Sequence, residues 1–215
     1  MLLAIDTSNE FAGVALWNED GLRAEATWYA GRQHTEQVLP QIALLLQHAR
    51  LSPSALLVVA VATGPGSWSG LRAGISLGKS IAVGLGIPIV GVPTLDALAN
   101  AYRGPEQVLA SVRIGRDRFA IARYVPEATG MRRAGPFESV GGAEVHALHG
   151  AVLLGDLAAK VGAQHEEAGS GAVSAVQQCR AAYLAAIAWA RHRRSDYDDL
   201  VTLEPIYLGN PVRTE

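Results

Sequence analysis

The sequence has only one cysteine, Cys179, among its 215 residues. A single cysteine excludes an internal disulfide framework and a cysteine-rich zinc site, and it favours a reducing, intracellular compartment. The formal net charge is −2 and charged residues make up 18% of the chain, so the strong positive charge typical of autonomous nucleic-acid-binding proteins is missing. We therefore expect any contact with nucleic acid to be local or made through a partner protein.

Long apolar runs are missing as well. Residues 1–6 have no positive charge ahead of their apolar stretch, so they do not resemble a secretory signal. The longest later run, residues 81–92, is interrupted by three glycines and Pro88, and it is shorter than the roughly 20 residues that cross a membrane as a helix. These features predict a cytoplasmic protein with no membrane partner.

The sequence also lacks common catalytic motifs. The six histidines form neither a His-Glu-x-x-His nor a His-x-x-x-His pattern, and a Gly-x-Ser-x-Gly elbow and a Walker loop are both missing. His146 and His149 are the one close pair, and we do not expect them to bind a metal. Cys179 falls on the apolar face of an expected helix, which favours a core position over a nucleophilic role. We therefore predict no catalytic residue and no metal ligand.

A regular alternation of strand and helix patterns is present in the first half of the chain. The order β-β-β-α-β-α-β-α predicts an α/β fold in which helices flank a mixed sheet. An Asp-Gly pair at residues 20–21 predicts a hairpin, and Pro40 either kinks the first helix or marks its first turn. The expected strands are residues 2–6, 11–17, 22–28, 56–63 and 87–92, and the expected helices are 35–51, 69–85 and 94–102.

Arg-Gly-Pro at residues 103–105 is the best candidate boundary between two lobes. We place the first lobe at residues 1–103 and a second, smaller and more divergent lobe at residues 104–215. Patterns in the second lobe are less regular. We expect strands at 108–113, 119–125 and 151–154, and a helix at 173–190.

The most informative stretch is Gly-Pro-Gly-Ser-Trp-Ser-Gly-Leu-Arg-Ala-Gly, at residues 64–74. It follows an expected strand and leads into an expected helix, so its backbone N–H groups and the positive end of the helix dipole converge on one spot. This arrangement predicts a place where an anion or a carboxylate of a partner binds.

The helix after this turn carries a stripe of small residues. Gly70, Gly74, Gly78, Ala82 and Gly86 are spaced four residues apart. Each glycine inside a helix costs roughly 1 kcal/mol relative to alanine, so several of them require a compensating close contact. That contact is either internal, with the protein's own helix or sheet, or external, with a partner helix.

The sequence leaves two alternatives for the binding partner of Arg72. Arg72 lies in the first turn of the helix, where a cation opposes the macrodipole, and its negative neighbour is either an internal carboxylate or an external anion or acidic side chain.

Asp6, Thr7 and Ser8 end the first strand, where nucleotide-binding proteins of the actin class have an aspartate before a phosphate-binding glycine loop. The loop glycine is missing here, so weak nucleotide binding and a turn-forming role both remain open.

Together these motifs resemble the TsaB (YeaZ) family. The resemblance rests on Leu-Ala-Ile-Asp-Thr-Ser at residues 3–8, His34 ahead of Leu39-Pro40, the glycine motif, and Ile-Val-Gly-Val-Pro-Thr-Leu at residues 89–95. It covers residues 1 to about 102 and weakens afterwards, since Ser-Val-Arg at residues 111–113 replaces the family's Asp-Ala-Arg. The resemblance implies an actin-like ATPase (ASKHA, ribonuclease H-like) fold with two lobes.

The resemblance also implies a function. Members of this family are non-catalytic and act with the catalytic paralogue TsaD, and with TsaC and TsaE, to place a threonylcarbamoyl group on the adenosine 3′ of the tRNA anticodon (t6A). TsaD has a His-x-x-x-His metal pair after the strand that corresponds to residues 89–92, where this sequence has Thr94 and Leu98. Neither residue replaces a histidine in a transition-metal site, so we expect the fold without the chemistry.

Several expectations about partners and cofactors follow from the same resemblance. TsaD and TsaE are the expected protein partners, tRNA is contacted indirectly through the complex, and a homodimer forms when the partner is absent. We expect no cofactor of the chain's own, although ATP or ADP can bind at the interface of the assembled complex.

The resemblance places the partner interface on the helices at 35–51 and 69–85. We expect Gly74→Leu or Gly78→Leu to abolish pairing while the lobe stays folded. Competing hypotheses are an actin-like nucleotide-binding enzyme or a metal-dependent peptidase-like protein acting alone, and a purely self-associating structural protein. The candidate interface residues are His34, Val38, Leu39, Ile42, Gly70, Arg72, Gly74, Gly78 and Ala82.

Overall fold

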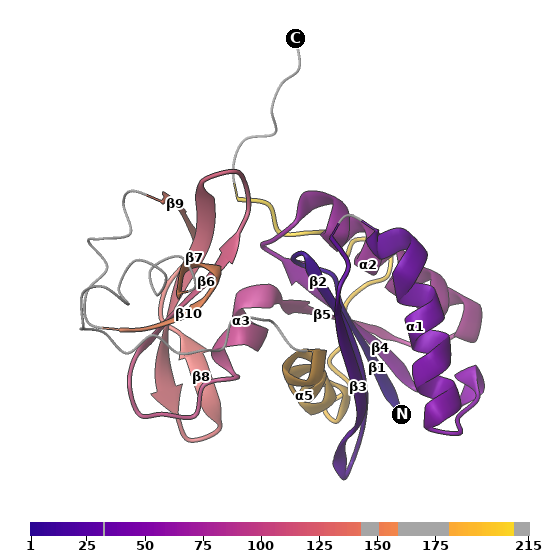
Figure 1. The fold of residues 1–215 in the computed structure, drawn as a ribbon. Helices are drawn as coiled ribbons and strands as arrows, with labels where there is room; N and C mark the ends of the chain where they lie inside the picture. The colour runs from indigo at the N-terminus through magenta and orange to yellow at the C-terminus, as the bar shows by residue number, and fades with distance from the viewer. Residues whose placement is uncertain (32, 143–150, 159–180, 209–215) are drawn as a thin grey trace.

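The chain folds into two lobes, each built on its own five-stranded sheet (Figure 1). The computed structural model describes residues 1–31, 33–142, 151–158 and 181–208. The strands of the first sheet are β1 (Leu2–Asp6), β2 (Phe11–Asn18), β3 (Gly21–Tyr29), β4 (Val58–Gly64) and β5 (Ile89–Pro93). Those of the second sheet are β6 (Val108–Arg113), β7 (Arg118–Glu127), β8 (Gly130–Arg133), β9 (Glu138–Gly141) and β10 (Val152–Gly155).

The first sheet has the strand order β3-β2-β1-β4-β5. β1 pairs antiparallel with β2 and parallel with β4, with Ile5 opposite Val61, and β4 pairs parallel with β5. All residues of β1 and β4 are buried, as expected for central strands that are covered on both faces. This mixed sheet and its helical connections form the predicted actin-like, ribonuclease H-like fold, and the expected fold class is confirmed.

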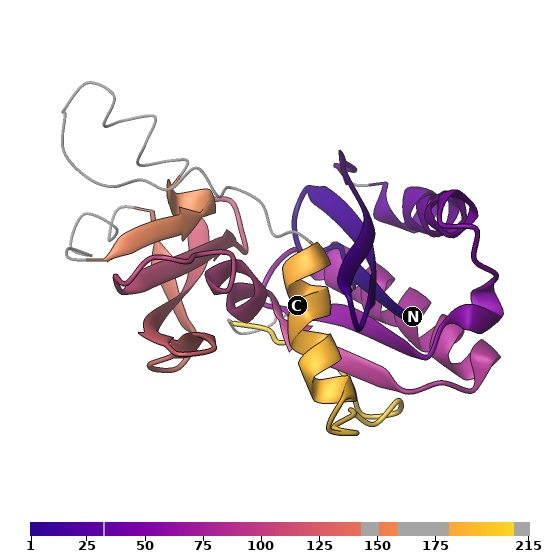
Figure 2. The same cartoon turned by 90° about the horizontal axis from the view of Figure 1, so that it is seen from below.

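Helices cover both faces of the first sheet. Helices α1 (His34–His48) and α2 (Trp68–Leu85) lie on one face, and α5 (Ala181–His192) lies on the other (Figures 1 and 2). Because side chains alternate along a strand, Leu3 and Ile5 join the core under α1 and α2, whereas Leu2 and Ala4 join the core under α5. The sheet is therefore the middle layer of a three-layer lobe.

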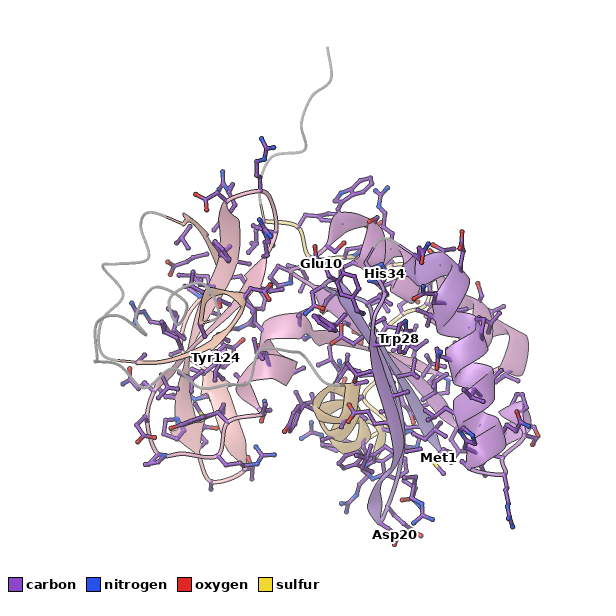
Figure 3. All side chains as sticks on the ribbon, in the orientation of Figure 1. Met1, Glu10, Asp20, Trp28, His34 and Tyr124 are labelled. Carbon is purple, nitrogen blue, oxygen red and sulfur yellow. The ribbon has the colours of Figure 1, made fainter. Side chains whose placement is uncertain are left out.

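The short helix α3 (Thr94–Ala99) connects the two lobes. Its apolar residues Leu95 and Leu98 pack with β6, β7 and β10 in the core of the second lobe. Tyr124 of β7, labelled in Figure 3, donates from its hydroxyl to Asp96 Oδ1 at 2.6 Å. The second sheet, with order β10-β6-β7-β8 and β9 paired to β7, is thus attached to the first lobe through buried contacts.

The end of the chain returns to the first lobe, so the assignment of all residues 104–215 to the second lobe was wrong. Ala181, Leu184, Ala185 and Ala188 of α5 are buried against the first sheet, where small side chains let the helix approach closely. Residues 197–208, which we call the C-terminal segment, also lie along this lobe, since Ile206 N donates to Thr63 O at 2.7 Å.

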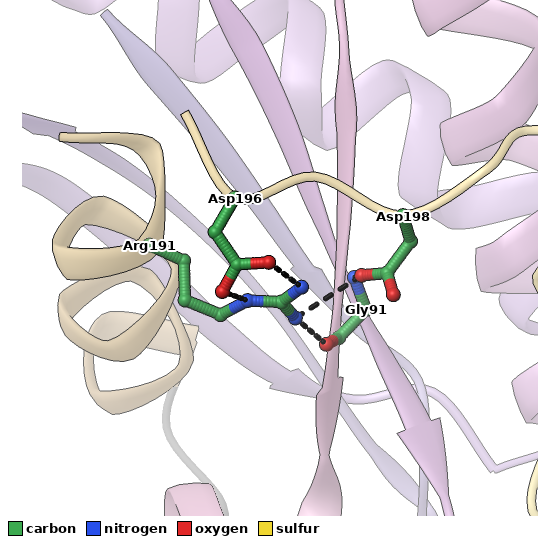
Figure 4. A network of polar contacts seen from close by, with 4 residues as sticks. All are labelled: Gly91, Arg191, Asp196 and Asp198. Carbon is green, nitrogen blue, oxygen red and sulfur yellow. Dashed lines mark hydrogen bonds and ion pairs between the residues drawn. The ribbon is translucent and has the colours of Figure 1, made fainter. Parts of the chain in front are cut away.

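A polar network holds the end of α5 to the edge of the first sheet (Figure 4). Arg191 donates to both carboxyl oxygens of Asp196, to Asp198 Oδ2 at 3.1 Å and to the carbonyl oxygen of Gly91 at 2.9 Å. Asp198 Oδ2 also accepts from Gly91 N at 2.7 Å. The hydrogen bond from Arg191 to Asp196 raises the pKa of the guanidinium, so the arginine is charged throughout the accessible pH range.

The expected elements of the first lobe are present, with boundaries shifted by a few residues. Pro40 lies inside α1, well after its first turn, so it does not mark the start of the helix. The strands β8 and β9 of the second lobe were not expected. His146, His149, Cys179 and the first part of the expected helix 173–190 lie outside the described residues. Within the described ranges, no helix combines the length and apolar character needed to cross a membrane.

Candidate functional site

The glycine motif and the loop after β1 form one tightly packed unit at the N-terminus of α2. Ser67 N donates to Ser8 O at 2.7 Å, and Thr7 Oγ1 donates to Gly70 O at 2.8 Å. Ser67 also caps α2, because its hydroxyl oxygen accepts from Gly70 N at 3.3 Å. The backbone of residues 6–8 is thereby fixed against the first turn of the helix.

The glycines of the motif make room for this loop. A Cβ atom on Gly66 would collide with Ser8 O, one on Gly70 with Thr7 O, and one on Gly74 with Thr7 Oγ1. Ser8 O, Thr7 O and Thr7 Oγ1 therefore occupy the space next to these glycines, and the binding of an anion or a partner carboxylate at this helix end stays a prediction. Of the two roles left open for Thr7 and Ser8, the geometry supports the turn-forming one.

The stripe of small residues on α2 faces the protein's own sheet. A Cβ atom on Gly78 would collide with Val61 of β4, and Ala82 is fully buried in the core under α1 and α2. Gly86 is outside this contact and ends the helix in a left-handed conformation with φ 64°. The internal alternative is therefore correct for Gly70, Gly74, Gly78 and Ala82, and these residues do not form an outer interface.

Most of the expected interface residues of α1 are also buried. His34, Val38 and Ile42 point into the lobe, whereas Leu39 is 53% exposed. His34 Nε2 lies 2.8 Å from Asn9 O, which ties the start of α1 to the β1–β2 turn near Glu10 (Figure 3). Of the full set of candidate interface residues, Leu39 and Arg72 are the exposed ones.

Asp6 is a buried carboxyl group at the end of β1. Its Oδ1 accepts from Ser8 N at 2.9 Å and from Ser8 Oγ at 2.6 Å, while Oδ2 has no hydrogen-bond partner among the described residues. Burial raises the pKa of Asp6, and the hydrogen bonds from Ser8 oppose this shift. The part of the chain that the structure describes holds no cluster of three histidine, cysteine or acidic side chains able to bind a metal ion.

Arg72 lies in an exposed cluster with two aromatic residues, which we call the arginine platform (Trp68, Arg72 and Tyr207). Its Cζ lies 3.6 Å from the centre of the Trp68 ring, and its Nε donates to the Tyr207 hydroxyl at 2.9 Å. The Trp68 and Tyr207 rings are 6.0 Å apart between centroids. No carboxylate pairs with Arg72 among the described residues, where its side-chain partners are Trp68 and Tyr207.

The exposed surface of α1 and α2 carries apolar and small side chains that sequence reasoning missed. Trp68 is 57% exposed and Val83 is 68% exposed, and Leu44 of α1 is also open to solvent. Between the two large residues on α2, Ser76 and Ser80 are exposed, and the Ser80 hydroxyl bonds back to Ser76 O at 2.8 Å. The four-residue spacing of Arg72, Ser76 and Ser80 was a usable signal, because it marks the face opposite the glycine stripe.

A family model and several known proteins match this chain. A family model described as TsaD, tRNA N6-adenosine threonylcarbamoyltransferase, matches residues 28–182. The tRNA threonylcarbamoyladenosine biosynthesis protein TsaB of Bacillus subtilis (strain 168) is 42% identical over 98 residues, which is 46% of this chain and 43% of that protein. The chain thus matches less than half of the length of this relative.

Two further similarities extend over nearly the whole chain. An uncharacterized protein of Mycobacterium tuberculosis (strain ATCC 25618 / H37Rv), Rv3421c, is 32% identical over 98% of this chain and 92% of its own length. The solved structure of YeaZ from Pseudomonas aeruginosa has a TM-score of 0.81 at 26% identity, covering 96% of this chain and 99% of that one. This chain therefore belongs to the TsaB (YeaZ) family.

Proposed function

We propose that this chain is a non-catalytic subunit of the machinery that makes t6A in tRNA, and that it binds the catalytic paralogue TsaD. The observation that carries the non-catalytic part is the structure of α3. Thr94 and Leu98, at the positions of the paralogue's metal-binding histidines, are both buried, and Leu98 packs with Leu95 in the core of the second lobe. A buried leucine supplies no ligand atom, so this position serves packing.

The exposed surface of α1 and α2 is the proposed binding surface for TsaD. Leu39, Leu44, Trp68 and Val83 present apolar area to solvent on these two helices, and such area favours a protein partner. The small exposed residues Ser76 and Ser80 allow a partner helix to approach α2 closely. In the absence of TsaD, we propose that the same surface pairs with a second copy of the chain.

We propose that TsaE, tRNA and nucleotide interact with this chain through the assembled complex. TsaE joins the assembly, tRNA is contacted indirectly, and ATP or ADP binds at the assembled interface with no cofactor held by this chain alone. The packing of Thr7 and Ser8 against Gly66 and Gly70 supports this view, because it leaves no glycine free to cradle a phosphate in the motif.

Reconstitution tests the proposal. Unmodified tRNA is incubated with TsaC, TsaD, TsaE, threonine, bicarbonate and ATP, with and without this chain, and t6A is measured by mass spectrometry of the digested tRNA. We expect t6A to form only with the chain present. Equal amounts of t6A in both reactions would overturn the proposed function.

A pair of matched variants tests whether TsaD binds the exposed surface of α2. Val83→Asp places a charge on the exposed surface of α2, whereas Leu57→Asp places the same charge on an exposed leucine outside both helices. We expect Val83→Asp to weaken TsaD binding in calorimetry and Leu57→Asp to leave it unchanged. An equal loss from both variants would place the binding surface elsewhere.

A further inference from the structure

The arginine platform holds a cation in a fixed position at the surface of α2. Three contacts restrict Arg72: the Trp68 ring under its guanidinium, the Tyr207 hydroxyl on its Nε, and the helix that carries it. A stacked and hydrogen-bonded arginine loses little further conformational entropy when it binds an anion. The platform is therefore preorganised.

The platform also has unused binding capacity. The Nη1 and Nη2 groups of Arg72 make no hydrogen bond or ion pair among the described residues. These groups form the planar fork that binds a carboxylate through two parallel hydrogen bonds. The sequence of α2 contains Arg72 and Lys79 and no acidic residue, so the helix surface favours a negative partner.

The composition of the platform favours a protein ligand over a nucleic acid. Tryptophan, tyrosine and arginine are the residue types most enriched in the energetic hot spots of protein interfaces. Binding to RNA phosphates requires several cations, whereas Lys79 on the same helix already donates to Val201 O at 3.2 Å. The exposed residues that follow along α2, Ser76, Ser80 and Val83, are uncharged.

We propose that the arginine platform is the hot spot of the partner interface, where Arg72 receives the carboxylate of an acidic side chain of the partner. The inference rests on the proposed function, since it uses the same surface of α2, and it adds a specific partner chemistry. It also makes the C-terminal segment part of the binding site, because Tyr207 comes from that segment.

The position of Tyr207 is set by backbone contacts to the first lobe. Ile206 N donates to Thr63 O at 2.7 Å, and Asp198 N donates to Ile89 O at 3.0 Å, so the segment is anchored on β4 and β5. Trp68 and Tyr207 remain 57% and 42% exposed, so both rings of the platform present surface to a partner. Residues that are far apart in sequence thus form one recognition surface.

Charge reversal on α2 tests the inference against a matched control. Arg72→Glu and Lys79→Glu change the same helix by the same charge, and Tyr207→Phe removes only the hydroxyl that bonds to Arg72. We expect Arg72→Glu to weaken TsaD binding roughly 30-fold or more, as for a hot-spot residue. We expect Tyr207→Phe to weaken it roughly 3- to 10-fold, and Lys79→Glu by less than about 3-fold.

A compensating substitution identifies the acidic partner residue. Aspartates and glutamates on the surface of TsaD are replaced singly by arginine and tested against Arg72→Glu, and we expect one of them to restore affinity. Arg72→Met, which keeps the apolar stem over Trp68, replaces Arg72→Glu if the charged variant does not fold, as judged by circular dichroism.

The possible outcomes separate this inference from the proposed function. Unchanged affinity of Arg72→Glu or Arg72→Met for TsaD, with normal binding by the wild-type chain, overturns the inference and leaves the proposed function intact. Failure of the wild-type chain to bind TsaD overturns both. Unchanged TsaD binding together with weaker tRNA binding by the assembled complex overturns the inference in favour of an RNA phosphate at Arg72.

Discussion

The two faces of α2 differ in what their residues contact. The inner face, Gly70, Gly74, Gly78 and Ala82, lies directly on Thr7 and on the strands of the first sheet. The outer face carries Arg72, Ser76, Ser80 and Val83, and these side chains are exposed. Small residues on the inner face fix the distance between helix and sheet, so the outer face is held rigidly and is free to specify a partner.

This difference changes how the glycine stripe is understood. A run of glycines at helical spacing indicates a close approach, but it does not identify the neighbour. Here the neighbour is the loop of residues 6–8 and β4, and the chemistry available to a partner lies on the opposite side of the same helix. The expected behaviour of Gly74→Leu changes accordingly, from loss of pairing in a stable lobe to loss of stability of the lobe itself.

Matched leucine substitutions on the two faces give the largest expected difference. Gly74→Leu would force a side chain against Thr7, whose hydroxyl bonds to Gly70 O, and we expect a loss of roughly 3 kcal/mol in the free energy of unfolding. Ser76→Leu, two residues away on the outer face, should change this free energy by less than about 0.5 kcal/mol. Urea denaturation measures both, and equal stabilities would mean that α2 can shift away from the loop.

Removal of the Asp198 carboxylate, which anchors the C-terminal segment, tests whether the position of Tyr207 beside the outer face of α2 depends on this anchor. Asp198→Ala leaves Gly91 N and Arg191 without their shared acceptor, and we expect a loss of about 1–3 kcal/mol in stability. Hydrogen exchange of the Ile206 amide, which donates to Thr63 O, should become faster as the segment loosens. Asp196→Ala removes an exposed partner of the same arginine, so it should have a smaller effect on both measurements.

The smallest expected effect concerns the pH dependence of the inner loop. Because burial raises the pKa of Asp6 above its ordinary value of 3.8, the folded state keeps this proton at pH values where the unfolded state has lost it. The contribution of Asp6 to stability is therefore full below pH 3.8 and decreases as the pH rises toward its folded pKa. Asp6→Asn should lack this decrease.

Denaturation of wild-type and Asp6→Asn protein over a pH series tests whether the contribution of Asp6 to stability decreases as the pH rises. Relative to the wild type, the variant should gain stability as the pH rises above about 4, since the asparagine oxygen can still accept from Ser8 N. A difference that is constant with pH would mean that Asp6 ionises as easily in the folded protein as in the unfolded one.

Sequence patterns predicted the first lobe well because its signals are local. A continuous apolar run marks β2, an Asp-Gly pair marks the turn before β3, and the apolar spacing of Val38 and Ile42 marks the buried side of α1. The same patterns did not predict β8 and β9, because their residues are mostly polar or glycine, whereas the equally short β10 is apolar.

Contacts between distant parts of the chain could not be predicted from such patterns. The apolar helix near the end of the chain carries no signal for which sheet it covers, so α5 was assigned to the wrong lobe. The partner of Arg72 is a tyrosine 135 residues further along the chain, and no local rule connects the two. The resemblance to a family identified the helices of the proposed interface, but it did not distinguish their inner residues from their outer ones.

The return of α5 to the first lobe has a consequence for the synthesis of the protein. All five strands of the first sheet are complete once Pro93 has been made, but Ala181, Leu184, Ala185 and Ala188 of α5, which cover one face of that sheet, are made much later. At a translation rate of about 5–20 residues per second, this interval lasts roughly 4 to 18 seconds. During that time Leu2, Ala4, Val58 and Ala60 lack their cover, so the first lobe is completed only after the strands of the second lobe have been made.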